Sequence, residues 1–232
     1  SDLTGHLLFS NNNIKKLVLE SKFSNQKNIK FTINTNENEQ ITTIFSDKAK
    51  PLVDRYKFIK GFSEGYLDFY SVKKNNQTQS ILKINDFKLK ELPALTKILT
   101  LASLQGIADL LSGEGIRFNE FEMRFSNKDK LMQIEEIYAI GPAISILMSG
   151  YIEKDKLISL RGTLVPATTI NKTIGSIPIL GNILVGKKVG EGVFGVSFKV
   201  KGPSKNLETT VNPIKTLTPR FITRTLEKIK KN

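Results

Sequence analysis

Cysteine and tryptophan are absent from this 232-residue chain, and His6 is its only histidine. Without a thiol the chain cannot form a disulfide, a zinc–thiolate site or an iron–sulfur cluster. A single histidine also excludes any metal site or catalytic mechanism that needs two of them within the chain. We therefore expect no metal site, and the informative features are the charge and the hydrophobic pattern.

The common enzyme motifs are missing as well. The chain has no G-x-S-x-G nucleophile turn, no G-x-x-x-x-G-K-[ST] phosphate loop and no H-E-x-x-H helix. The segment Gly190–Gly195 reads G-E-G-V-F-G, but it leads into a strand-like run, whereas a dinucleotide loop leads from a strand into a helix. The close acidic pairs Glu120/Glu122 and Glu135/Glu136 are expected at solvated strand positions. We expect no catalytic residue, no cofactor and no enzymatic activity.

Long apolar runs are also lacking. The nearest candidate for a membrane span, residues 92–111, is interrupted by Pro93, Lys97 and Asp109. No signal peptide is visible, and the chain begins at Ser1 within strand-like sequence. We expect it to be a piece of a longer protein.

Most of the chain alternates apolar and polar residues with a period of two, which is typical of half-buried strands. Clear examples are Ile29–Ile33, Ile158–Leu164 and Phe194–Val200. Turn residues recur about every ten positions, as in an antiparallel meander. A change of phase at Asn85–Asp86 predicts a bulge. The predicted fold is mainly β, an antiparallel meander curled into an open groove.

Three segments have a different pattern. Apolar residues recur at helical spacing over 93–112, with Pro93 suited to a first turn, Gly113 to a stop and Gly106 to a break. Residues 166–186 predict one or two short helical turns. The chain ends in a predicted basic amphipathic helix that starts near Thr218.

The formal net charge of +13 is concentrated at this end. Residues 1–160 carry 22 basic and 19 acidic side chains, whereas residues 161–232 carry 13 and 3. Such an end is expected to contact anionic headgroups or an acidic partner, through Arg220, Arg224, Lys228, Lys230 and Lys231. Nucleic acid is not expected as a partner, because Phe194 and Phe198 share an apolar face with Val196 and Val200.

Several blocks resemble one family in sequence and in order. They read I-N-D-F-K-L-K-E-L-P-A-L-T-K-I-L-T-L-A-S-L-Q-G-I-A-D-L-L-S-G-E-G-I-R-F-N-E-F (Ile84–Phe121), L-R-G-T-L-V-P-A-T-T-I-N (Leu160–Asn171), I-P-I-L-G-N-I-L-V-G (Ile177–Gly186) and G-E-G-V-F-G-V-S-F-K-V-K-G-P (Gly190–Pro203). Together they resemble the C-terminal region of AsmA-like, YhdP-type bacterial envelope proteins. Residues 1–83 are similar only in general strand character, so we expect strand repeats over 1–83 and the family's C-terminal region over 84–232. The Thr218–Arg220 segment departs from the family pattern.

The resemblance implies a periplasmic module of a longer protein with an upstream inner-membrane anchor. It further implies a β groove for bridge-like phospholipid transport between the inner and outer membranes, in the service of outer-membrane biogenesis. The alternative is a structural or docking end-domain that contacts the outer membrane or an outer-membrane protein without conducting lipid. On the first hypothesis a charge at Phe194 or Phe198 blocks transfer, and for each candidate a place in the packed core is an open alternative. The candidate lipid-binding residues are Phe118, Phe125, Ile144, Ile146, Met148, Ile158, Leu160, Leu164, Phe194, Val196, Phe198 and Val200.

Overall fold

A computed structural model of the chain describes residues 3–10, 13–55, 61–166 and 195–214. These residues form one twelve-stranded sheet in which every strand pairs antiparallel with the next one along the chain. The strands are β1 (Leu3–Ser10), β2 (Asn13–Lys22), β3 (Asn28–Thr35), β4 (Glu39–Ser46), β5 (Ser63–Lys74), β6 (Gln77–Leu89), β7 (Ile116–Lys128), β8 (Leu131–Ile140), β9 (Ile144–Glu153), β10 (Leu157–Pro166), β11 (Gly195–Gly202) and β12 (Glu208–Ile214). The predicted mainly-β meander is confirmed.

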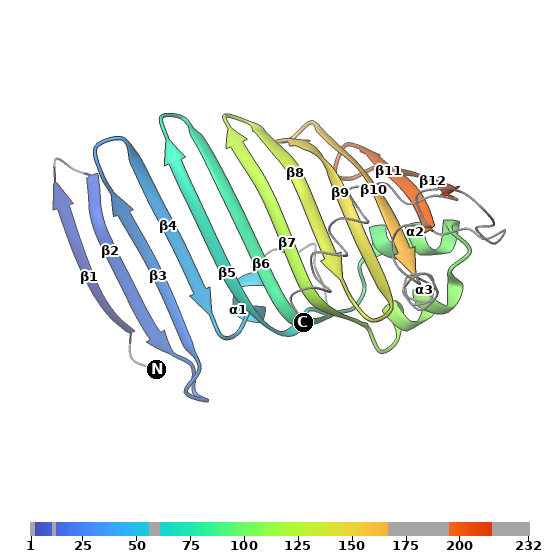
Figure 1. Ribbon diagram of the computed structural model, residues 1–232, viewed down its shortest axis with the longest axis horizontal. Coiled ribbons are helices and arrows are strands. Elements are labelled where there is room, and N and C mark those ends of the chain that lie inside the picture. The colour runs from blue at the N-terminus through green and yellow to red at the C-terminus, as the bar shows by residue number, and fades with distance from the viewer. Residues whose placement is uncertain (1–2, 11–12, 56–60, 167–194, 215–232) are drawn as a thin grey trace, which may run out of the picture.

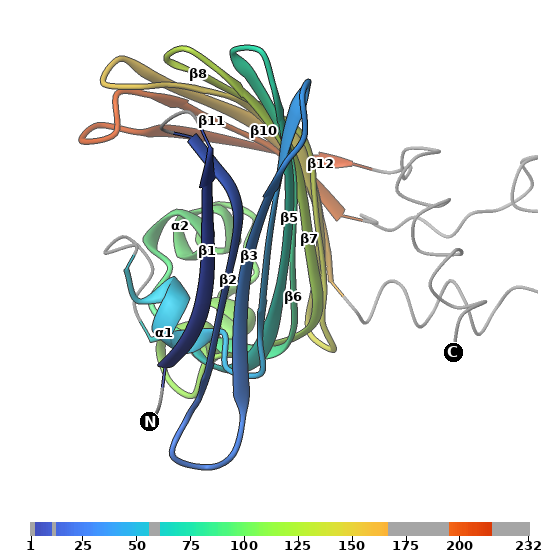
Figure 2. The same cartoon turned by 90° about the vertical axis from the view of Figure 1, so that its left-hand side faces the viewer.

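The sheet is open and curled, and it does not close on itself (Figure 1). Three short helices lie on its concave side, as the end-on view in Figure 2 shows. They are α1 (Lys50–Val53), α2 (Pro93–Leu101) and α3 (Gln105–Ser112). All three belong to connections at the same end of the strands, whereas the turns that follow β3, β5, β7, β9 and β11 lie at the other end. The sheet therefore forms a trough, and helices occupy part of it.

The strand register aligns apolar side chains into rows that cross the whole concave face. Alternate residues of a strand point to the same face, so partners in register line up across neighbouring strands. Three such rows follow from the pairing. The first is Leu3, Ser21, Ile29, Ser46, Leu67, Ile84, Phe121, Ala139, Ile146, Leu164, Val196 and Pro213. The second is Gly5, Leu19, Phe31, Ile44, Phe69, Leu82, Met123, Ile137, Met148, Gly162, Phe198 and Val211. The third is Leu7, Leu17, Ile33, Thr42, Ser71, Ser80, Phe125, Ile134, Gly150, Leu160, Val200 and Thr209.

The convex face carries most of the charges of the strands. One row there alternates in sign across the strands, with Glu20 beside Lys30 and Asp68 beside Lys83, which in turn adjoins Glu122. The Nζ of Lys30 lies 2.6 Å from a carboxylate oxygen of Glu20, and the Nζ of Lys83 lies 3.5 Å from one of Glu122. Opposite charges on neighbouring strands stabilise a given register. Glu122 and Glu136 on this face are only 4% and 5% exposed, so the solvated positions expected for them from the sequence are wrong.

Helices α2 and α3 form a hairpin whose apolar side packs on the concave face. Pro93 occupies the first turn of α2 and Gly113 caps the end of α3, as predicted. The predicted break at Gly106 is wrong, because α3 runs through that residue. The break lies at Ala102–Leu104, where Ser103 adopts a left-handed conformation with φ 58°. The buried side chains of the hairpin are Leu95, Ile98, Leu99, Ala108 and Leu111.

The strand alternation changes phase near the base of this hairpin. Ile84 faces the core, and after Asp86, which has a φ of 54°, so do Phe87 and Leu89. The predicted phase change is therefore present, but the predicted bulge is wrong, because β6 keeps its register with both β5 and β7. Phe87 stacks between Phe62 and Phe118, with ring centroids 5.2 and 5.3 Å apart. This stack anchors the helix-covered section of the sheet.

Two predicted helical regions, 167–186 and the C-terminal helix from Thr218, lie outside the described residues. Pro166, the first residue of the predicted 166–186 segment, ends β10. The expected boundary between residues 83 and 84 falls within β6.

The seating of α3 leads to a stability prediction. Leu111 is 0% exposed and its neighbour Leu110 is 39% exposed. Leu111→Ala is expected to lower the free energy of unfolding by about 2–5 kcal/mol, because it leaves a cavity under the helix. Leu110→Ala is expected to change it by less than about 1 kcal/mol. Denaturant titration of both variants measures the difference, and equal losses would show that α3 does not rest on the sheet.

Candidate functional site

Eleven of the twelve candidate lipid-binding residues lie on the concave face. Most belong to the three rows above, while Phe118, Ile144 and Ile158 extend that surface toward the two ends of the strands. Phe194 lies outside the described residues. The period-two pattern in the sequence therefore brought together residues from β7, β9, β10 and β11 on one surface.

This surface has a covered section. The buried candidates pack in one cluster with side chains of α2 and α3, and they form a core there: Phe118, Ile144, Ile146, Leu164, Val196, Phe198 and Val200. The remaining four candidates are half-buried: Phe125, Met148, Ile158 and Leu160. Two of them, Met148 and Leu160, pack against the cluster. For the seven buried residues, the core alternative left open by the sequence is the one observed.

The N-terminal strands form an open section of the same face. No described helix packs over β1–β3, and the concave residues Leu3 and Leu7 are 68% and 53% exposed. Half-buried side chains continue the apolar floor from β2 to β4: Leu17, Leu19, Phe31, Ile33 and Ile44. We call these five residues, with Leu3 and Leu7, the open floor. They are functional candidates that the sequence reasoning missed, although the alternation of Leu17 with Leu19 and of Phe31 with Ile33 was a usable signal.

Gly162 lets large side chains pack closely together on the section of the concave face that α2 and α3 cover. A Cβ added to Gly162 would lie 2.5 Å from the Cβ of Met148 and 2.6 Å from the Cζ of Phe198. Contacts this short are not tolerated, so the absence of a side chain lets the Phe198 ring lie across β10. The large residues on both sides of Gly162 thus form a continuous surface.

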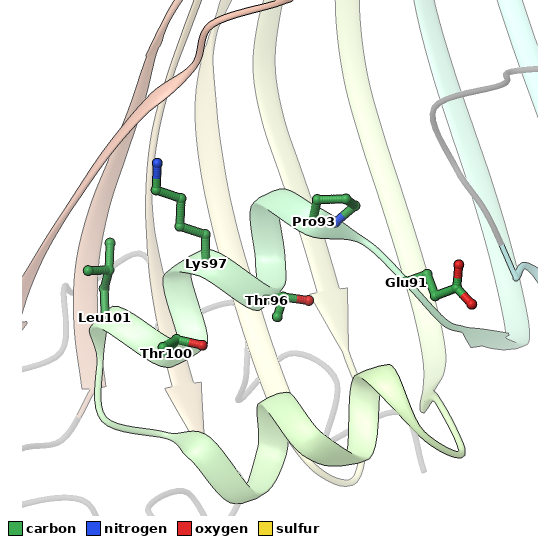
Figure 3. A pocket seen from close by; sticks show the side chains of 6 residues that line it. All are labelled: Glu91, Pro93, Thr96, Lys97, Thr100 and Leu101. Atoms are coloured by element: carbon green, nitrogen blue, oxygen red, sulfur yellow. The ribbon is translucent and has the colours of Figure 1, made fainter.

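A shallow hollow of about 400 Å³ lies on α2, lined by Glu91, Pro93, Thr96, Lys97, Thr100 and Leu101. Figure 3 shows Lys97 and Leu101 pointing away from α3, with the strands behind the helix. Thr96 donates its hydroxyl to the carbonyl of Leu92, 3.2 Å away, so that group is already used within the helix. The hollow contains no nucleophile–base pair, and we assign it no chemistry.

A second hollow, of about 410 Å³, is lined mostly by residues of the convex face, among them Glu136, Ser149, Arg161 and Thr163. Within the described part of the chain, no three or more His, Cys, Asp or Glu residues are placed to hold a metal ion. No helix among the described residues is long and apolar enough to cross a membrane. The five basic residues of the predicted tail, from Arg220 to Lys231, lie outside the described residues.

The chain was compared with protein-family models, with curated proteins and with solved structures, and none of the three comparisons found a match.

Proposed function

We propose that this chain is a non-enzymatic module that carries phospholipid acyl chains on the concave face of its sheet. The observation that supports this best is the second row, which is apolar across all twelve strands, together with the exposed Leu3 and Leu7 on β1 and the absence of a described helix over β1–β3. A water-soluble domain normally covers such a face. Here the face is left uncovered along one section and covered by its own helices along the other.

The physical basis is simple partitioning. An acyl chain gains about 0.8 kcal/mol for each CH₂ group that it removes from water. Neighbouring strands lie about 4.8 Å apart, so the floor from β1 to β4 spans roughly 15 Å. The second row offers an apolar side chain on each strand from β2 to β4, namely Leu19, Phe31 and Ile44, so an acyl chain could slide there without specific bonds. The helix hairpin would then act as the stop at the far end of the trough.

The cellular setting of the proposal rests on the resemblance to AsmA-like envelope proteins. In that setting the module lies in the periplasm as part of a longer, anchored protein and belongs to a bridge for phospholipid between two membranes. The alternative docking role depends on the basic tail, and no contact of the described residues favours it.

A photocrosslinking pair tests the proposal. The probe p-benzoylphenylalanine replaces either Phe31 on the open floor or Phe45 on the convex face of the adjacent strand. After incubation with vesicles of phosphatidylethanolamine and phosphatidylglycerol, irradiation is expected to attach lipid at position 31 and not at position 45, as read by intact-protein mass spectrometry. Phe45 is 40% exposed, whereas Phe31 is half-buried and therefore less exposed. If labelling depended on solvent exposure alone, position 45 would be labelled more strongly than position 31. Equal labelling, or none at position 31, would refute an acyl-chain floor.

A further inference from the structure

The concave face carries one charged side chain in its regular rows from β3 to β12. A fourth row, nearest the hairpin tips, contains Thr35, Gln40, Lys73, Thr78, Asn127, Met132, Ile152, Ile158 and Gly202. Lys73 is the only charged member of this row, and the three rows below it contain no charge. Lys73 is exposed and makes no salt bridge with any described residue. A positive charge without an ion-pair partner among the described residues thus lies at the edge of the apolar face, near the β-hairpin tips.

Hydrogen-bonding groups surround this lysine on the same face. Gln40 and Thr78 are its direct cross-strand neighbours on β4 and β6, so their Cβ atoms lie about 5 Å from that of Lys73. The Nε2 of Gln40 donates one hydrogen to the Oγ1 of Thr35, 3.2 Å away, and its second N–H is left for a ligand. One row below, the hydroxyls of Ser71 and Ser80 lie 3.0 Å apart. In the fourth row the polar residues lie on β3–β7. On β8–β10 this row is apolar, with Met132, Ile152 and Ile158.

The distance between this polar cluster and the apolar floor indicates which part of a lipid the cluster could bind. Residues two apart along a strand are about 6.7 Å apart, so Lys73 lies roughly 13 Å along β5 from Phe69 in the second apolar row. A lipid with its acyl chains on the floor would present its headgroup at that level. One lysine with hydroxyl and amide donors, and without a carboxylate in the rows, complements an anion rather than a cation or a neutral group.

We propose that Lys73, with Gln40 and Thr78, forms a subsite for the phosphate of a phospholipid headgroup. This inference rests on the proposed function, because the headgroup is located there only if the acyl chains occupy the floor. The subsite would favour phosphate-bearing lipids over lipids that have the same acyl chains and no phosphate.

The adjacent residue provides a matched control. Lys74 is also exposed, but it belongs to the convex face. Its partners in the strand register are Glu39 on β4 and Gln77 on β6. Lys73→Gln and Lys74→Gln remove the same charge from neighbouring positions of one strand. The purified chain and the three variants Lys73→Gln, Lys74→Gln and Lys73→Arg are loaded with fluorescent phosphatidylglycerol or with diacylglycerol of identical acyl chains. Loading of phosphatidylglycerol is expected to fall about fivefold in Lys73→Gln and to stay unchanged in Lys74→Gln and in Lys73→Arg. Loading of diacylglycerol is expected to be the same in all four proteins.

Failure of this inference and failure of the proposed function give different results. If the unmodified chain loads phosphatidylglycerol but the two glutamine variants behave alike, the headgroup subsite is refuted and the acyl floor remains. If Lys73→Gln loses both lipids equally, the lysine acts on the trough as a whole, and the phosphate assignment is wrong. If the unmodified chain loads neither lipid, the proposed function itself fails.

Discussion

Replacing Phe31 with aspartate is expected to lower phospholipid loading by at least about tenfold while the chain remains folded. Phe31 is the third member of the second apolar row, between Leu19 and Ile44. An acyl chain that crosses this position would have to remove a carboxylate from water without a partner, which costs several kcal/mol. Because the floor is open here, the carboxylate stays hydrated when no lipid is bound, and the cost falls on loading rather than on folding.

Phe45→Asp is the matched control for this change. Phe45 lies on the convex face opposite Lys30, so its replacement removes the same ring and adds the same charge on the other side of the sheet. Loading of a fluorescent phospholipid is expected to stay within about twofold of the unmodified chain, since the altered group does not reach the trough. Circular dichroism and thermal unfolding of both variants establish that the fold is retained. If Phe31→Asp loads lipid as well as Phe45→Asp does, acyl chains do not lie on this floor.

The strands were predictable because a period of two follows directly from strand geometry, and the chain follows it over most of its length. The same property placed eleven site residues on one face before their partners were known. Alternation defines a face but carries no information on what packs against it. Phe198 and Phe31 have similar local patterns, yet α2 and α3 cover only the section that contains Phe198.

Two local details show where the pattern becomes ambiguous. In β4 the alternating run Ile41, Thr43 and Phe45 lies on the convex face, while Ile44 alone is aligned with the apolar row through Phe31 and Phe69. A strand with apolar residues on both faces has no preferred side until its neighbours set the register. At the helix hairpin, Gly106 was the obvious candidate for a break, but Ser103 takes the left-handed conformation instead. Tertiary packing of Leu99 and Leu111 determines that position more than local propensity does.

Phe198→Asp is expected to unfold the chain or to lower its free energy of unfolding by about 5 kcal/mol or more. Phe198 is 5% exposed and belongs to the core cluster together with Leu99 of α2 and Leu111 of α3. The substitution removes a buried aromatic ring and places a carboxylate in a row that contains no basic side chain. Domains of this size have only about 5–15 kcal/mol of net stability, so a loss of that magnitude is close to the whole. The loss of lipid transfer expected for this variant from the sequence would therefore follow from unfolding.

Thr210→Asp separates burial from the mere addition of a negative charge at this end of the sheet. Thr210 is exposed on the convex face and pairs with Lys199, so its new carboxylate faces an opposite charge and should change stability by no more than about 0.5 kcal/mol. Urea titration followed by circular dichroism measures both variants.

Phe31 and Phe198 are members of the same row, and the same substitution is expected to abolish loading at one end and folding at the other. If Phe198→Asp folded with the stability of the unmodified chain, water would reach the floor beneath α2 and α3. The trough would then be open along its full length, and the helix hairpin could not be its stop.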